Sequence, residues 1–179
     1  MNTLMVKELS WGVRVSSDFR EKVFEISDRF GWTDRHASWL MACMAFESAE
    51  TFSPSIKNGA GSGAVGLIQF MPKTAEGLGT STEALARMVG IEQLEWVARY
   101  FKPYVSRIHT LPDMYMAILM PSFIGRPESA ILFKQGTKAY TQNKGLDANR
   151  DGVVTKLEAA RKVNAKLIKG MGEGYVWRA

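Results

Sequence analysis

The chain has 179 residues, of which 46% are hydrophobic and 23% are charged, and its formal net charge is +5. These values are typical of a single globular domain, and the sequence holds no internal repeat or low-complexity tract. The single cysteine excludes an internal disulfide, and two histidines far apart in the sequence do not suggest a zinc site.

The N-terminal region lacks the apolar core of a cleavable signal, and no apolar run is long enough to cross a bilayer. We therefore expect a protein made in the cytoplasm that reaches any other compartment by an unusual route. The positive charge favours an anionic partner such as an acidic cell envelope or anionic lipid, or it reflects a mildly basic, solvated surface. Because the chain has no basic block and no nucleic-acid motif, we expect no nucleic-acid partner.

Helical periodicity runs through most of the chain. Apolar spacing, caps and helix-ending glycines predict helices over residues 16–31, 33–48, 72–79, 81–90, 91–104, 111–120, 126–133 and 155–171. A loop rich in Gly, Ser, Asn and Pro covers residues 49–66, and the strand signal is confined to a short hairpin in residues 55–68. The sequence therefore predicts a mainly α fold.

The helix over residues 33–48 is apolar around its whole circumference, which predicts a central, buried helix. Leu40, Cys43 and Glu47 follow one another at spacings of three and four, so they share one face. Loss of hydration on that apolar face should raise the pKa of Glu47, as a general acid requires near neutral pH. The alternative is an exposed glutamate at a helix end that only solvates the fold.

The segment GSGAVGLIQFMPKTA, residues 61–75, follows this acid. Gly61, Gly63 and Gly66 allow backbone conformations barred to other residues and let a polymer lie close to the main chain. Gln69 offers donors and an acceptor for hydroxyl and acetamido groups, and Met71 suits the apolar face of a sugar ring. Taken singly, each has a structural explanation as a turn glycine, a surface glutamine or a core methionine.

Together, the Glu-Ser pair and GAVGLIQFMPKTA resemble the soluble lytic transglycosylase (SLT) family, which shares a lysozyme-like fold with goose-type lysozymes. The family pattern is Glu-Ser followed by Gly-Ala-x-Gly-Leu-x-Gln-x-Met-Pro-x-Thr-Ala. The chain matches it at Glu47, Ser48, Gly63, Ala64, Gly66, Leu67, Gln69, Met71, Pro72, Thr74 and Ala75. The resemblance covers roughly residues 30–140, and the QF variant with LPDMYMAILMPSFIG is most similar to phage-encoded members.

The resemblance implies that Glu47 is the catalytic acid, acting on the β-1,4 bond between N-acetylmuramic acid and N-acetylglucosamine in peptidoglycan. Glu47 would protonate the glycosidic oxygen and then take a proton from the muramyl C6 hydroxyl, leaving a 1,6-anhydro end. One acid would then suffice, whereas ordinary glycosidases use two. Ser48, Gly66, Gln69 and Met71 would contact the glycan. If a second acid such as Glu50 took part, a hydrolytic muramidase would be the alternative.

One part of the family pattern differs here. Many members carry Ala-Tyr-Asn-Ala-Gly after the glycine loop, whereas this chain has YMAILMPSFIG, without an asparagine. Tyr115 in this segment and Tyr140 in AYTQN are candidates for a hydroxyl near Glu47 that contacts substrate. Core packing is the alternative for each.

The segment DANRDGVVTKLE resembles the twelve-residue EF-hand calcium loop. The predicted ligands are Asp147, Asn149, Asp151, the carbonyl of Val153, Thr155 and Glu158. Gly152 would make the sharp turn. Because the loop is single, we expect Ca²⁺ to stabilise the fold rather than to signal, and catalysis to need no cofactor. The alternative is an Asp/Asn-rich turn that caps the last helix without metal.

The sequence therefore predicts a mainly α, lysozyme-like fold, with a catalytic domain over residues 1–145. The EF-hand-like loop and C-terminal helix, residues 146–179, are expected to pack on it. The leading hypothesis is a monomeric phage endolysin, released by a holin, that acts on peptidoglycan in the periplasm. A virion-associated enzyme, a secreted toxin, an inactive glycan-binding module and a calcium-responsive interaction protein are the alternatives. The basic last helix touches an anionic envelope surface or packs on the domain.

Overall fold

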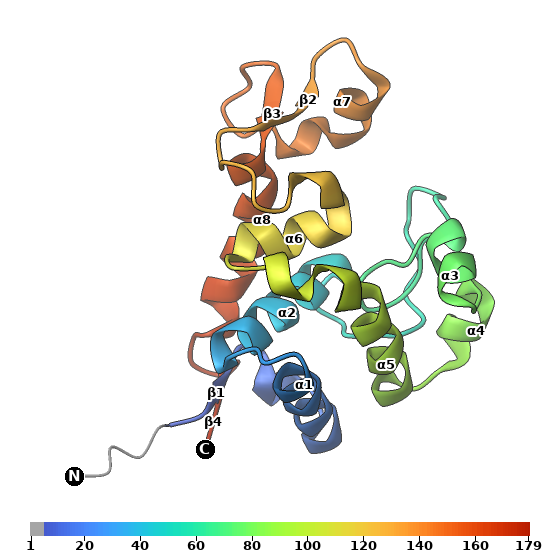
Figure 1. Ribbon diagram of the computed structural model, residues 1–179, viewed down its shortest axis with the longest axis vertical. Coiled ribbons are helices and arrows are strands. Elements are labelled where there is room, and N and C mark those ends of the chain that lie inside the picture. Colours follow the sequence, from blue (N-terminus) through green and yellow to red (C-terminus); the bar gives the residue numbers. More distant parts are fainter. Residues whose placement is uncertain (1–5) are drawn as a thin grey trace. The chain divides into compact units, whose positions relative to one another are not determined.

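The computed structural model describes residues 6–179 and is mainly helical, as the sequence predicts (Figure 1). The chain divides into two compact units. Unit 1 comprises Met1–Pro103 and Lys166–Ala179, and unit 2 comprises Tyr104–Ala165. The units are defined by compactness and do not test the expected division at residue 145, which stays a prediction. None of the helices in residues 6–179 is long and apolar enough to span a bilayer.

Unit 1 is built on helices that enclose an apolar core. Its helices are η1 (Gly12–Arg14), α1 (Ser17–Arg29), α2 (Asp34–Glu47), α3 (Pro72–Leu78), α4 (Thr82–Arg87) and α5 (Gly90–Phe101). Near the two ends of the described chain, β1 (Glu8–Leu9) pairs antiparallel with β4 (Trp177–Arg178). This pairing fastens the C-terminal segment to the start of unit 1.

Helix α2 is the central helix of unit 1, which confirms the prediction. Every residue from 37 to 45 is buried, as expected for a helix that is apolar all round. Its N-terminus is closed by a capping box, in which the Thr33 N–H donates to His36 Nδ1 at 3.3 Å. The burial of this helix holds its last residue, Glu47, in a fixed place.

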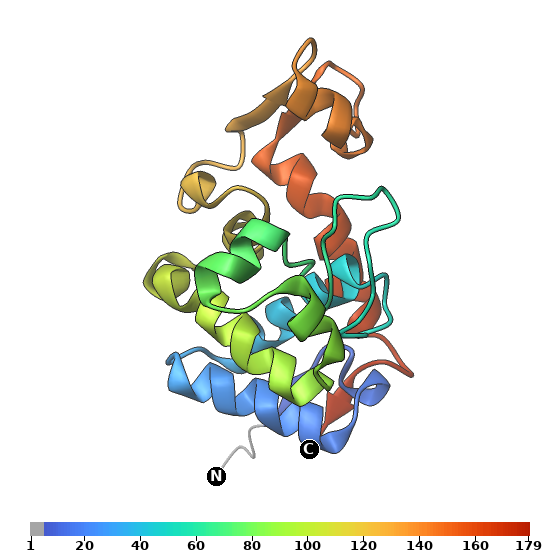
Figure 2. The same cartoon turned by 90° about the vertical axis from the view of Figure 1, so that its right-hand side faces the viewer.

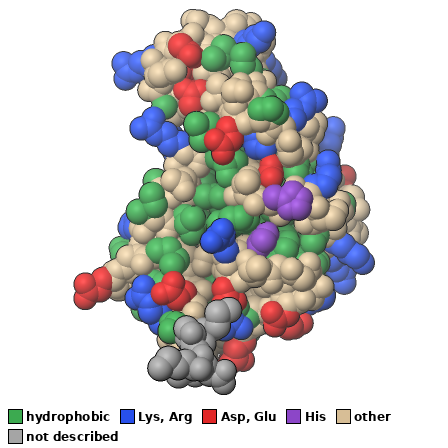
Figure 3. Space-filling view, turned by 60° about the vertical axis from the view of Figure 1, so that its left-hand side comes forward, with side chains coloured by type: hydrophobic (Ala, Val, Ile, Leu, Met, Phe, Trp, Pro, Cys, Tyr) green, Lys and Arg blue, Asp and Glu red, His purple; other side chains and the backbone are tan. Residues whose placement is uncertain are grey.

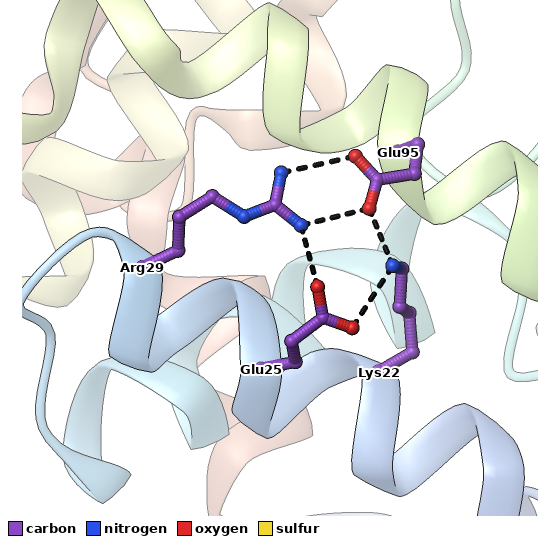
Figure 4. Close-up of polar contacts among 4 residues, drawn as sticks. All are labelled: Lys22, Glu25, Arg29 and Glu95. Atoms are coloured by element: carbon purple, nitrogen blue, oxygen red, sulfur yellow. Dashed lines mark hydrogen bonds and ion pairs between the residues drawn. The ribbon is translucent and has the colours of Figure 1, made fainter.

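An ion-pair network joins α1 to α5, two helices that lie side by side in Figures 1 and 2. Figure 4 shows Arg29 bonded to both oxygens of Glu95, at 3.0 and 2.7 Å, and to Glu25 at 2.9 Å. Lys22 closes the ring, with its Nζ 2.5 Å from Glu95 and 3.0 Å from Glu25. Hydrogen bonds from Arg29 and Lys22 lower the pKa of Glu95 to about 2. The network supports the packing of α1 against α5, and α1 also packs against α2.

Unit 2 combines short helices with a two-stranded sheet. The elements from residue 102 to residue 170, some crossing the unit boundaries, are η2 (Lys102–Arg107), α6 (Leu111–Leu119), η3 (Pro121–Phe123), β2 (Ile131–Lys134), α7 (Lys138–Asn143), η4 (Lys144–Leu146), β3 (Val153–Thr155) and α8 (Lys156–Gly170). Strands β2 and β3 are antiparallel, with Phe133 opposite Val154. The buried Lys156 Nζ lies 2.6 Å from Asp113 Oδ1 and donates to the Arg126 carbonyl at 2.8 Å. These bonds attach the start of α8 to α6.

One predicted helix is wrong. Residues 126–133 form a turn followed by β2 rather than a helix. Here pairing with a strand some twenty residues later in the chain prevails over local helical spacing. Helix α7 and the strand pairs were also not predicted, because each is very short.

Charge on the face drawn in Figure 3 is mixed. Lys and Arg side chains alternate there with Asp and Glu side chains instead of gathering in one patch. On this face, the mixture of charges fits a mildly basic, solvated surface.

Candidate functional site

Glu47 is the last residue of α2, and its side chain is half-buried. Burial raises the pKa of its carboxyl to about 7, so the group exchanges a proton near neutral pH. One turn earlier, burial and then the negative form of Glu47 raise the pKa of the Cys43 thiol. This electrostatic link is expected if both residues lie on one face, as their spacing predicts.

The end of α2 is a tightly bonded turn. The Glu50 N–H donates to the Ala45 carbonyl at 2.7 Å, and the Ala49 N–H donates to the Phe46 carbonyl at 3.3 Å. These two bonds form a Schellman motif, in which the residue at Ala49 takes a left-handed conformation and is usually glycine. Ala49 has φ 50°, so the backbone is strained two residues after Glu47.

Ser48 lies inside this turn. Its side chain is fully buried, and its hydroxyl accepts the Phe52 N–H at 2.9 Å. The Thr51 hydroxyl donates to the Ser48 carbonyl at 2.7 Å. The structure thus favours a role for Ser48 in holding the turn, and its predicted glycan contact stays a prediction.

Gly66 is buried and has φ +85°, and its nearest neighbour is the side chain of Gln93. A Cβ on Gly66 would lie 2.3 Å from Gln93 Oε1. Gln93 accepts the Leu67 N–H at 2.8 Å and donates to the carbonyls of Pro54 and Leu85 at 2.8 and 2.9 Å. The glycine therefore admits a buried amide that organises the loop, rather than a glycan at that point. Sequence reasoning missed Gln93, although its place four residues before the buried Val97 was a signal.

The two other residues predicted to contact glycan, Gln69 and Met71, differ in their surroundings. Gln69 has φ 54°, and its amide nitrogen donates to the carbonyls of Ile56 and Gly66 at 3.2 and 3.1 Å. Met71 is 46% exposed at the start of α3. Of these two, Met71 offers its side chain to a ligand, while the Gln69 amide nitrogen holds the loop.

A cavity of about 510 Å³ lies beside this loop. Gly63, Val65 and Pro72 line it, together with charged residues of both signs that include Lys57 and Arg87. It has room for a polar group beside the glycine-rich segment.

Residues 32–111 match the family model of the transglycosylase SLT domain. The match begins just before α2, contains Glu47 and the whole glycine-rich loop, and ends at the first residue of α6. No curated protein matches the chain. The match shows that this part of the chain is similar to the SLT domain, and it indicates transglycosylase-type degradation of peptidoglycan.

Tyr115 and Tyr140, the two candidates for a hydroxyl that contacts substrate near Glu47, both belong to unit 2. Tyr115 lies in α6 and is 3% exposed. The Tyr140 hydroxyl donates to Asp147 Oδ2 at 2.7 Å, which raises the pKa of Tyr140. The described contact of Tyr140 is thus with the EF-hand-like loop, and substrate contacts by either tyrosine stay predictions.

The EF-hand-like loop has part of the expected geometry. Gly152 has φ +86° at the sharp turn, and Val153–Thr155 form β3. Glu158 Oε1 is buried without a hydrogen-bond partner, whereas its Oε2 accepts from Thr155.

The carboxylates at the start of this loop bond to the backbone. Asp147 accepts the N–H groups of Asp151 and Gly152, Asn149 accepts that of Asp151, and Asp151 accepts that of Val153. In residues 6–179, no group of three or more His, Cys, Asp or Glu is placed to hold a metal ion. Three of the six predicted ligands, Asn149, Thr155 and the Val153 carbonyl, are of other types, so calcium binding by this loop stays a prediction.

Proposed function

We propose that the protein is a peptidoglycan lytic transglycosylase in which Glu47 is the single catalytic acid. The observation that carries this proposal is a half-buried carboxyl with a pKa of about 7 at the end of α2, within the residues that match the SLT domain. A carboxyl with this pKa is protonated often enough to act as an acid at neutral pH, and its conjugate base is strong enough to accept a proton later.

The proposed reaction uses both forms of Glu47. The acid gives its proton to the glycosidic oxygen, the bond from that oxygen to muramyl C1 breaks, and the bonding electrons stay on the leaving oxygen. The muramyl C6 oxygen then bonds to C1 and loses its proton to the Glu47 carboxylate. The acid is restored and the product has a 1,6-anhydro end. A hydrolytic muramidase, in which water takes the place of the C6 hydroxyl, is the alternative.

Mass spectrometry of the fragments released from purified peptidoglycan tests the proposal. We expect fragments lighter by one water than their hydrolytic counterparts, and no release by Glu47→Gln. Fragments with reducing ends would identify a hydrolase instead. Release by a folded Glu47→Gln variant would remove Glu47 from the mechanism, and a wild type that binds glycan without cutting it would be an inactive binding module.

We further propose a phage endolysin that a holin releases to the periplasm. The similarity of QF and LPDMYMAILMPSFIG to phage-encoded members supports this setting. The test is expression in a Gram-negative cell with and without a holin. Lysis that depends on the holin is expected, whereas lysis without it, or presence of the protein in purified virions, would favour a different route of delivery.

We also propose that residues 147–158 bind Ca²⁺ as a structural ion. The loop spacing, the left-handed Gly152 and the unpartnered Glu158 Oε1 support this proposal. The ion would draw together carboxylates that now bond to backbone N–H groups. The melting temperature should rise on adding Ca²⁺ to chelator-treated protein and stay constant in Glu158→Gln. Equal melting of the wild type with Ca²⁺ and with chelator would discard the site.

A further inference from the structure

The turn after Glu47 is held in a conformation that its residues disfavour. Ala49, Glu50 and Phe52 have φ of 50°, 66° and 50°, in the left-handed region that residues other than glycine rarely occupy. Three such residues within four positions persist only where the surrounding structure over-determines them, and this kind of strain gathers at functional sites.

Two sets of contacts inside unit 1 stabilise the turn in this strained conformation. The first is the Schellman motif and the Ser48 hydroxyl described above, which fix the backbone. The second is the burial of the Phe52 ring, which lies 6.0 Å from the ring of Trp11 and 6.1 Å from that of Phe19. These contacts leave the carboxylate of Glu50 to be placed by other groups.

Two lysines of α8 bind that carboxylate. Lys169 Nζ donates to Glu50 Oε1 at 2.9 Å and to Oε2 at 2.7 Å, and Lys166 Nζ donates to Oε1. The side chain of Glu50 is 27% exposed, so water screens the pairs only in part. Hydrogen bonds from Lys166 and Lys169 hold the pKa of Glu50 below its usual value.

The end of α8 that carries these lysines is itself fixed to unit 1. The Trp11 indole N–H donates to the Lys166 carbonyl at 2.9 Å, and the Trp11 backbone N–H donates to the Gly170 carbonyl at 3.0 Å. Gly170 allows this approach, since a Cβ there would lie 2.2 Å from atoms of Ser10 and Trp11. The ammonium groups are therefore presented by an anchored helix end.

We infer that Glu50 is a positioning residue, and that its ion pairs with Lys166 and Lys169 hold the strained turn and thereby fix the direction of the Glu47 carboxyl. This inference rests on the proposed function of Glu47. It assigns Glu50 a role different from that of a second catalytic carboxylate. A carboxylate held by two ammonium groups is a weak base and a weak nucleophile, and it is suited to anchoring.

The test compares Glu50→Gln, the double variant Lys166→Met with Lys169→Met, and the variant that combines all three changes. The substrate is soluble, peptide-free glycan strands, and kcat and KM are measured well below each melting temperature. Because a misplaced catalytic group costs up to about 100-fold in rate, we expect Glu50→Gln to lower kcat by about 10- to 100-fold with KM unchanged. The lysine variant should lose the same factor, and the combined variant no more, since one interaction is removed in each case.

Glu95→Gln is the matched control, because Glu95 is also an ion-paired glutamate held by two cations. It should lower the melting temperature and leave kcat unchanged. The pH at which kcat falls, which reports Glu47, should also be the same in Glu50→Gln and in the wild type. If the lysine double variant does not fold, the single variant Lys169→Met is compared with Glu50→Gln instead, because Lys169 bonds to both oxygens of Glu50.

Two outcomes overturn the inference while leaving the proposed function intact. Loss of all activity in Glu50→Gln with wild-type kcat in the lysine variants would make Glu50 a catalytic residue. Wild-type kcat in Glu50→Gln, with only its melting temperature lowered, would make the contact purely structural. A separate result, cleavage by Glu47→Gln, would instead remove the proposed function.

Discussion

Replacing Glu47 by glutamine removes a titratable group while keeping the size of the side chain. In the folded protein burial raises the pKa of Glu47 to about 7 from an ordinary value of 4.5. The folded state therefore holds a proton that the unfolded state has released between these two values. Stability falls as pH rises through this window and is constant above it.

The size of the effect follows from the same shift. A pKa change from 4.5 to about 7 corresponds to about 3 kcal/mol of lost stability at high pH. We therefore expect the free energy of unfolding of Glu47→Gln to be close to that of the wild type below pH 4.5. At pH 8 the variant should be more stable than the wild type by up to about 3 kcal/mol.

Urea unfolding of both proteins at intervals between pH 4 and pH 8 measures this difference directly. Other titrating groups are common to both proteins, so they cancel in the comparison. The activity of the wild type should fall above about pH 7 on the same proton. A stability difference that is constant across this pH range would show that Glu47 is not buried as described, and would remove the reason for its acidity.

Three further predictions concern the frame around the site. Glu95→Gln should destabilise the protein by at most about 1 kcal/mol at neutral pH, since the network is partly exposed. Because the pKa of Glu95 is lowered to about 2, the stability difference between variant and wild type in urea unfolding should disappear as pH falls from 4.5 towards 2, and a difference that grew in acid would contradict the ion pairing. Gly66→Ala should lower the free energy of unfolding by about 3 kcal/mol, because the new Cβ would meet Gln93 and φ is positive, whereas Gly61→Ala, with φ +75° and open space around it, should lower it by about 1 kcal/mol. Equal losses of stability in chemical unfolding would mean that the Gln93 side chain moves to make room for the methyl group. Ala49→Gly should stabilise the protein by about 1 kcal/mol by relieving left-handed strain, and a lower melting temperature would argue against the Schellman motif.

Features that depend on local spacing could be predicted from the amino-acid sequence. The all-round apolar pattern predicted the buried helix α2, and the spacing of Leu40, Cys43 and Glu47 predicted a carboxyl with a raised pKa. Proline at the start of α3 marked that helix correctly. These inferences succeed because helix formation and the desolvation of a helical face depend on residues within one or two turns.

Contacts between residues far apart in the sequence could not be predicted in this way, because they depend on how the whole chain packs. Strand β2 forms because it pairs with β3, and Gly66 is required because Gln93 packs against it. Glu50 finds its partners 116 and 119 residues away in α8. No local pattern reports such contacts, because they arise when the packing of whole helices brings charges together and excludes water from them.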